Sequence, residues 1–114
     1  MDIPLLSPVT RRFDDRSTAK RFAFTFYCDL CGGAWRSARY PFNPGTLAAP
    51  IDPAIYQILW NDQHRAAWAR ANRDASFAFN GCPVCGRRVC EACFHLSEIG
   101  RSDLCKACLD QYST

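Results

Sequence analysis

The clearest hydrophobic pattern in the chain is a strict alternation of apolar residues with polar or small residues over residues 20–27. Phe22, Phe24 and Phe26 occupy every second position of this segment. Because successive side chains of a strand point to opposite faces, the alternation predicts a half-buried β-strand. Residues 34–40 are expected to return beside it, so the two segments together predict a β-hairpin.

A second pattern, with helical spacing, begins after a proline-rich loop. Asp52 and Pro53 are residue types preferred at the N-cap and at the first position of a helix. They predict a helix from Pro53 to about Ala75, which forms an insert over about residues 52–76. Its apolar residues recur on one face, whereas Asn72 is expected to lie largely away from that face. The face comprises Tyr56, Trp60, His64, Ala67, Trp68, Ala71 and Ala75.

The remaining segments carry weaker signals. Residues 1–19 show no periodicity, and we expect them to form an N-terminal arm. Residues 20–114 are expected to form a single domain, since a chain of 114 residues fits one compact unit. Within this unit, residues 76–80 are predicted to form a short strand that leads into the second half of the chain.

Eight cysteines in four C-x-x-C pairs give the strongest chemical signal. A C-x-x-C turn brings two sulfur atoms to the separation needed around one tetrahedral zinc ion. The chain begins without a basic segment followed by a long apolar one, so we expect a cytoplasmic location, where metal ligation is favoured over disulfides. We therefore predict two Zn²⁺ ions, each closed by four thiolates and hence structural. The pairs are Cys28/Cys31, Cys82/Cys85, Cys90/Cys93 and Cys105/Cys108.

Glycine and charge refine this prediction. Gly32 and Gly86 directly follow the first two pairs, where the backbone is often pushed into the left-handed region that glycine tolerates. Both pairs are therefore interpreted as zinc knuckles, the first at the tip of the hairpin. Eight thiolates and two zinc ions change the formal charge from +3 to −1 (+3 − 8 + 4), so the basic balance of the chain does not indicate nucleic-acid binding.

The spacing of the pairs leaves two arrangements open. Cys85 and Cys90 are five residues apart, which spans about 16 Å in an extended chain and is too far for two ligands of one ion. If that segment is extended, the second and third pairs serve different ions. The first pair then shares an ion either with the third pair, as a cross-brace, or with the second pair, sequentially.

The motif from Cys82 to Cys93, C-x-x-C-G-x-x-x-C-x-x-C with one C-x-x-C on each side, resembles the FYVE-type zinc finger. That family belongs to the treble-clef, cross-brace group with RING and PHD fingers. The resemblance implies a treble-clef C-terminal half, whereas the long helical insert is unusual for the family. Together with the hairpin and helix predicted from the residue patterns, the expected fold is a small α+β zinc-stabilised domain with two zinc-knuckle hairpins, one long inserted helix and a treble-clef C-terminal half. The resemblance also implies a short final helix starting near Cys105. The implied ligands are Cys28, Cys31, Cys90 and Cys93 for site 1, and Cys82, Cys85, Cys105 and Cys108 for site 2.

The sequence departs from the family at its lipid site. FYVE domains bind a membrane phosphoinositide through a basic stretch around the third cysteine, and residues 79–84 (FNGCPV) stand there instead. We therefore expect no phosphoinositide binding and no membrane partner. The ligand pattern carries over to this chain, and the lipid-binding motif does not.

The expected interaction surface lies on the predicted helix and hairpin. Tyr56, Trp60 and Trp68 lie on the apolar helix face, which is widened over its first two turns by Ile55, Ile58 and Leu59. We therefore expect a protein-binding module, with a protein partner or a homodimer. The same face could instead cover the hairpin as ordinary core, an alternative that the sequence leaves open.

The sequence also fits two other functions. Arg21, Arg36 and Arg39 flank aromatic strands, a pattern typical of nucleic-acid-binding surfaces with a basic rim. A RING-like adaptor or ligase role rests on fold analogy alone, and the C-x-H motif of RING fingers is missing. No nucleophile–base motif, phosphate loop or carboxylate pair is found, so no enzyme is expected. His64 is interpreted as a core histidine, and His95 could at most replace a cysteine ligand.

Overall fold

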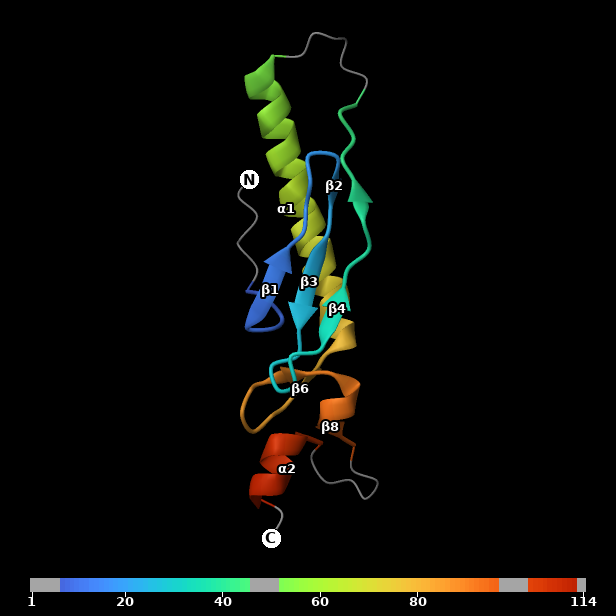
Figure 1. Ribbon diagram of the computed structural model, residues 1–114. Helices are drawn as coiled ribbons and strands as arrows, with labels where there is room; N and C mark the ends of the chain where they lie inside the picture. The colour runs from blue at the N-terminus through green and yellow to red at the C-terminus, as the bar shows by residue number, and fades with distance from the viewer. Residues whose placement is uncertain (1–6, 46–51, 97–102, 113–114) are drawn as a thin grey trace.

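The alternating segment forms the centre of a three-stranded antiparallel sheet, in the order β1-β3-β4 (Figure 1). The computed structural model describes residues 7–45, 52–96 and 103–112. Strands β2 and β5 continue the same hairpin as a separate antiparallel pair. The predicted hairpin is therefore confirmed, with each predicted strand divided in two. The strands of this half are β1 (Arg12–Asp15), β2 (Arg21–Phe22), β3 (Phe24–Tyr27), β4 (Ala34–Arg36) and β5 (Tyr40–Pro41).

Strand β1 departs from the arm expected at residues 1–19. Phe13 pairs with Phe26 across the sheet, with 6.0 Å between the ring centroids, and lies 4.6 Å from Trp68. A single apolar residue among charged neighbours gives no alternation to detect in the sequence. The strand forms because β3 offers a hydrogen-bonding edge and the Trp68 ring packs against one side of Phe13, which stays 38% exposed. The division of the chain into an arm and a domain stays a prediction.

One long helix, α1 (Pro53–Ala78), covers the hairpin. Its start is as predicted, because the Asp52 side chain accepts a hydrogen bond from the Ala54 N–H at 2.8 Å. Its end is later than predicted, and the strand expected at residues 76–80 is wrong over its first half. The last turn of the helix is closed by the Phe79 N–H, which donates to the Ala75 carbonyl at 3.2 Å, and Phe77 within that turn is 84% exposed.

The aromatic face of α1 packs against the three alternating phenylalanines of the hairpin. The Phe22, Phe24 and Phe26 side chains are at most 2% exposed. Trp60 lies 5.2 Å from Phe22, and Trp68 lies 5.3 Å from Phe24, measured between ring centroids. Burying each phenylalanine contributes roughly 1.5–3 kcal/mol before entropy is subtracted. Most of the predicted apolar face therefore forms ordinary core.

Asn72 corrects the predicted helix face. It was expected away from the apolar side, yet its side chain is only 6% exposed. Its amide oxygen accepts the Val9 N–H at 2.8 Å, and its amide nitrogen donates to the Ser7 carbonyl at 3.0 Å. The asparagine is tolerated in the core because both of its polar atoms are bonded, and it fixes the segment before β1 against the helix.

The cysteine-rich half lies at the far end of the hairpin and α1, so the molecule measures 67 × 26 × 20 Å (Figure 1). Its radius of gyration is 18.5 Å, against about 13 Å for a compact domain of roughly 100 residues. The fold is thus a small α+β structure with one long helix and several hairpins. The elements of this half are β6 (Asn80–Gly81), β7 (Arg88–Val89), η1 (Glu91–Cys93), β8 (Phe94–His95), β9 (Leu104–Cys105) and α2 (Lys106–Tyr112).

Candidate metal centres

Two C-x-x-C turns have the same backbone structure. In the first, the Cys28 N–H donates to the Gly33 carbonyl at 2.9 Å, and the Gly32 N–H donates to the Cys28 carbonyl at 3.0 Å. In the second, the Cys82 N–H bonds to the residue five positions ahead, and the Gly86 N–H returns to the Cys82 carbonyl, both at 2.9 Å. Gly32 and Gly86 have φ of 75° and 77°, as the knuckle interpretation requires.

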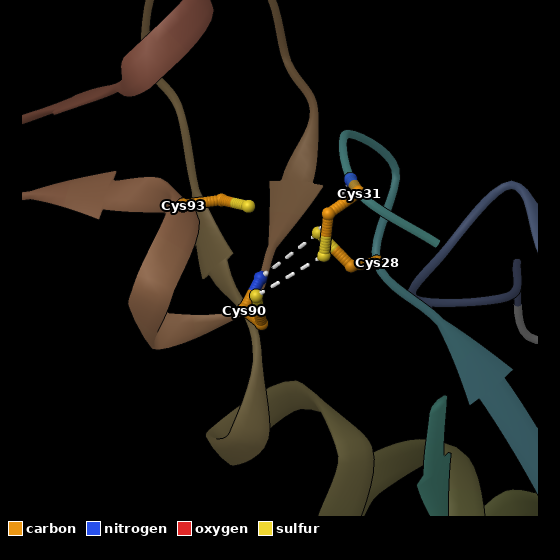
Figure 2. Close-up of side chains that lie close together, drawn as sticks. All are labelled: Cys28, Cys31, Cys90 and Cys93. Carbon is orange, nitrogen blue, oxygen red and sulfur yellow. Dashed lines mark hydrogen bonds between the residues drawn. The ribbon is translucent and has the colours of Figure 1, made fainter. Parts of the chain in front are cut away.

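Each knuckle faces a cysteine pair from a later segment of the chain. In cluster 1, the sulfur atoms of all four cysteines lie within 4.8 Å of one another (Figure 2). In cluster 2, the same limit holds. The sulfur atoms of Cys31 and Cys90 are 3.6 Å apart, as are those of Cys85 and Cys105. Cluster 1 is Cys28, Cys31, Cys90 and Cys93, and cluster 2 is Cys82, Cys85, Cys105 and Cys108.

These distances fit a zinc ion. Tetrahedral coordination at about 2.3 Å from each sulfur places the sulfur atoms about 3.8 Å from one another. The grouping is the crossed one that the resemblance implies, and the sequential arrangement left open by the spacing is not found. The structure thus has two four-cysteine sites, each of which could hold one metal ion. All-thiolate donors in this geometry favour zinc.

Backbone N–H groups stabilise one thiolate in each cluster. Burial raises the pKa of Cys28, but hydrogen bonds from the N–H groups of Cys31, Cys90 and Leu30, at 3.3–3.4 Å, outweigh burial and bring this pKa to about 6. The pKa of Cys82 is also about 6, because N–H donors again outweigh burial. In both clusters one of the donors is the N–H of the first cysteine of the partner pair.

The last cysteine of each cluster behaves in the opposite way. Burial, followed by the neighbouring cysteines, raises the pKa of Cys93 and of Cys108 to about 12. Several thiolates crowded together repel one another, so the later ones ionise only with difficulty. A divalent cation removes that repulsion, and the donor set therefore matches a cation in each cluster.

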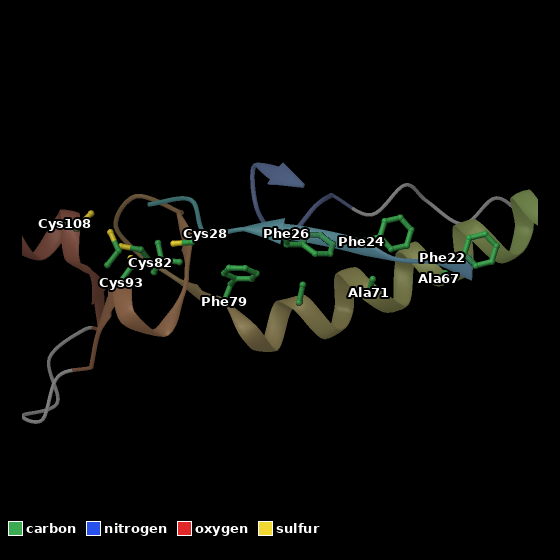
Figure 3. Packing of buried hydrophobic residues seen from close by; sticks show 13 residues of the cluster. Phe22, Phe24, Phe26, Cys28, Ala67, Ala71, Phe79, Cys82, Cys93 and Cys108 are labelled. Carbon is green, nitrogen blue, oxygen red and sulfur yellow. The ribbon is translucent and has the colours of Figure 1, made fainter. Parts of the chain in front are cut away.

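The buried cysteines belong to the hydrophobic core and are not a separate layer. One cluster of buried residues extends from Phe22 past Phe79 to Cys108 (Figure 3). Val89, which follows the second knuckle in sequence, is fully buried, and Phe79, directly after α1, is 5% exposed. The apolar surroundings keep water away from the sulfur atoms and hold the ligand side chains in one geometry.

Asp29 is a structural residue of cluster 1 that sequence reasoning missed. It lies inside the first C-x-x-C, and its two carboxylate oxygens accept the backbone N–H groups of Arg11 and Arg88, each at 2.8 Å. The Asp29 N–H donates to the Arg88 carbonyl at 3.0 Å. This residue therefore joins the first knuckle to the segment before β1 and to β7. An acid between two cysteines gives no signal of such distant partners.

Arg87 is a second residue near the sulfur atoms. Its backbone N–H is the largest factor that lowers the pKa of Cys85, and its guanidinium donates to the Cys85 sulfur at 3.7 Å. A positive charge at this position offsets part of the negative charge of a four-thiolate site. Its basic type was visible in the sequence, but its orientation toward sulfur was not.

The two histidines lie outside both clusters. His64 is hydrogen-bonded to the Asp15 carboxylate at 2.7 Å and stacks on Trp60 with 4.9 Å between ring centroids. It therefore lies at the edge of the aromatic core, as a satisfied histidine. His95 lies in β8 with an exposed side chain.

Fold and site together define a small α+β protein with two four-cysteine clusters, consistent with a double zinc-binding finger. No family model, curated protein or solved structure shows significant similarity to the chain. Among residues 7–45, 52–96 and 103–112, no helix has the length and apolar character needed to cross a membrane.

Proposed function

We propose that the chain is a FYVE-like, cross-brace module that binds two zinc ions and has a binding role rather than an enzymatic one. The crossed grouping of the thiols is the observation that carries this proposal. Four thiolates fill the coordination sphere of a tetrahedral zinc ion and leave no position for water or substrate. The same chemistry needs a reducing compartment, so a cytoplasmic location is part of the proposal.

Metal content and metal removal test this proposal. We expect two zinc ions per chain by elemental analysis of the purified protein. Structural zinc contributes roughly 10–16 kcal/mol in isolated fingers, as much as the roughly 5–15 kcal/mol that stabilises a whole domain. Complete chelation should therefore unfold the cysteine-rich half. One metal ion per chain, intramolecular disulfides, or an unchanged near-ultraviolet circular dichroism spectrum after chelation would each contradict the proposal.

A protein contact at the free end of α1 is the finer part of the proposal. Trp60 and Trp68 are engaged with the hairpin, which leaves the first two turns of the helix as the apolar surface. Ile55 and Ile58 are 53% and 61% exposed, and Tyr56 is 38% exposed. We take a second copy of the chain as the partner, because one apolar helix face can pair with itself around a twofold axis.

Analytical ultracentrifugation tests self-association of the zinc-loaded chain. We expect a dimer that dissociates when Ile55 and Ile58 are both replaced by lysine. The matched control replaces Gln57 and Asn61, which are exposed near the start of α1 and hydrogen-bond to each other at 2.9 Å, with two lysines. A monomer at the highest soluble concentration, or equal effects of the two double variants, would exclude this contact.

A further inference from the structure

A basic hollow lies on the face of the hairpin that points away from α1. Its volume is about 610 Å³, and it extends over β2, β3 and β4. The alternation that directs Phe22, Phe24 and Phe26 toward the helix (Figure 3) directs the residues between them to this opposite face. The hollow therefore lies on the outer face of the sheet. We call it the arginine hollow, after Arg16, Arg21, Arg36 and Arg39, which line it.

The charge of the arginine hollow is largely uncompensated. Arg16 pairs with Asp14 at 3.2 Å, and the same carboxylate accepts the Tyr27 hydroxyl at 2.6 Å. In the part of the chain that the structure describes, the other three arginines form no ion pair. No aspartate or glutamate lines the hollow. Three arginines that form no ion pair among the described residues thus line one hollow of a protein whose zinc-loaded formal charge is −1, so overall basicity does not explain them.

We propose that the arginine hollow binds the phosphodiester backbone of a single-stranded nucleic acid. A guanidinium group presents a planar fork of donors that matches two oxygens of one phosphate. Several such groups on adjacent strands suit a ligand with repeated negative charges. The volume of the hollow falls within the roughly 300–1,000 Å³ of small-molecule pockets, so it accommodates nucleotides of a flexible strand better than the rigid surface of a duplex.

An acidic peptide offers the same negative charge as a nucleic acid, but it has fewer groups that can interact with arginine side chains. Carboxylates also accept bidentate hydrogen bonds from arginine, whereas the flat guanidinium groups can in addition stack on nucleobases. Tyr27 adds an aromatic ring to the lining of the hollow, and the Arg12 guanidinium lies over that ring at 4.4 Å from its centroid. Arginine planes beside an aromatic ring are the groups with which single-strand-binding surfaces hold bases without sequence preference.

The test measures binding of the zinc-loaded full chain to a fluorescein-labelled single-stranded oligonucleotide by fluorescence anisotropy, over a series of salt concentrations. The variant replaces Arg36 and Arg39, both exposed, with glutamine. The matched control replaces Arg65 and Arg73, which are exposed on α1, with glutamine and changes the net charge equally. Zinc content and circular dichroism of each variant establish that the fold is intact, which separates this test from that of the two-zinc module.

We expect the hollow variant to lose affinity about tenfold or more, while the control changes much less. Losing two phosphate contacts should also make the negative slope of log K against log salt shallower by about 1.4. Equal losses in both variants would show a general charge effect and overturn the proposal. It would equally be overturned by no binding, by stronger binding to a duplex or to polyglutamate of matched charge, or by selective binding to phosphoinositide vesicles.

Discussion

At the scale of single residues, Asp29 links the metal chemistry to the fold. A C-x-x-C turn needs only its two sulfur atoms to hold an ion, and the residues between them are free to make other contacts. Here the carboxylate of Asp29 accepts one N–H from Arg11 and one from Arg88, at 2.8 Å each. Hydrogen bonds to a charged acceptor are worth more than neutral ones, so this one side chain stabilises the contact between the two halves.

Replacing Asp29 with asparagine should destabilise the zinc-loaded protein by about 1–3 kcal/mol. The amide nitrogen of asparagine cannot accept a hydrogen bond, so one of the two backbone N–H groups loses its partner. The free energy of unfolding in denaturant measures the effect, and elemental analysis should still find two zinc ions. Asp62→Asn, at an exposed position of α1, is the control. Equal unfolding free energies for the two variants would contradict this role of Asp29.

Gly86 permits a second prediction at the residue scale. Its φ is 77°, and a Cβ atom built on it meets no other atom within 4 Å, so the cost of substitution comes from the backbone alone. Gly86→Ala should destabilise the protein by roughly 1–2 kcal/mol, and Gly86→Asn by less, because asparagine tolerates the left-handed region. Thermal unfolding of the zinc-loaded variants checks this order. Alanine and asparagine variants of equal stability would argue against a strained knuckle.

At the scale of elements, some aromatic residues of α1 are packed against the hairpin, and others remain partly exposed to solvent. The ring centroid of Trp68 lies 4.6 Å from that of Phe13 and 5.4 Å from that of Phe26. This side chain of α1 therefore contacts both β1 and β3. Tyr56 touches Phe42 at 5.3 Å but remains 38% exposed near the start of the helix. Two aromatic residues on one predicted face therefore differ in their contribution to stability.

Trp68→Ala should cost about 3–5 kcal/mol, and Tyr56→Ala should cost much less. Removing the indole leaves a cavity beside three phenylalanines, whereas truncating a partly exposed tyrosine removes mainly a surface contact. Denaturant unfolding of both variants, with zinc content held at two ions, gives the comparison. If Tyr56→Ala lowered the free energy of unfolding as much as Trp68→Ala does, the first turns of α1 would contribute to the core as much as its middle does, contrary to this prediction.

Local patterns predicted those elements whose signals lie within a few residues. The alternation at Phe22, Phe24 and Phe26 predicted the buried strand, and Asp52 with Pro53 predicted the start of α1. Strand β1 was missed because its one apolar side chain is stabilised by Trp68 from a distant segment. The hydrogen bonds of the Asn72 and Asp29 side chains were missed for the same reason. Their partners are separated from them by as many as 65 positions along the chain.

At the scale of the whole molecule, the clusters connect segments that the hydrophobic core alone holds weakly. The protein is 67 Å long and only 20–26 Å wide, so a residue in either half has few neighbours in the other. Cluster 1 takes one cysteine pair from the N-terminal hairpin and one from the segment after β7. The eight candidate ligands were evident from their spacing. Their crossed grouping required a family resemblance, since residue spacing leaves the path of the chain between pairs undetermined.

The crossed grouping predicts how zinc loss spreads through the molecule. Replacing Cys28 and Cys31 together with serine should release one zinc ion and leave the other bound. Cys90 and Cys93 then lose their ion and should react rapidly with a thiol-alkylating reagent, because a bound metal is what shields a thiolate. Mass spectrometry of the alkylated chain locates the modified cysteines. Labelling of Cys82 and Cys85 in place of that pair would mean sequential sites. The thiols expected to stay protected are Cys82, Cys85, Cys105 and Cys108.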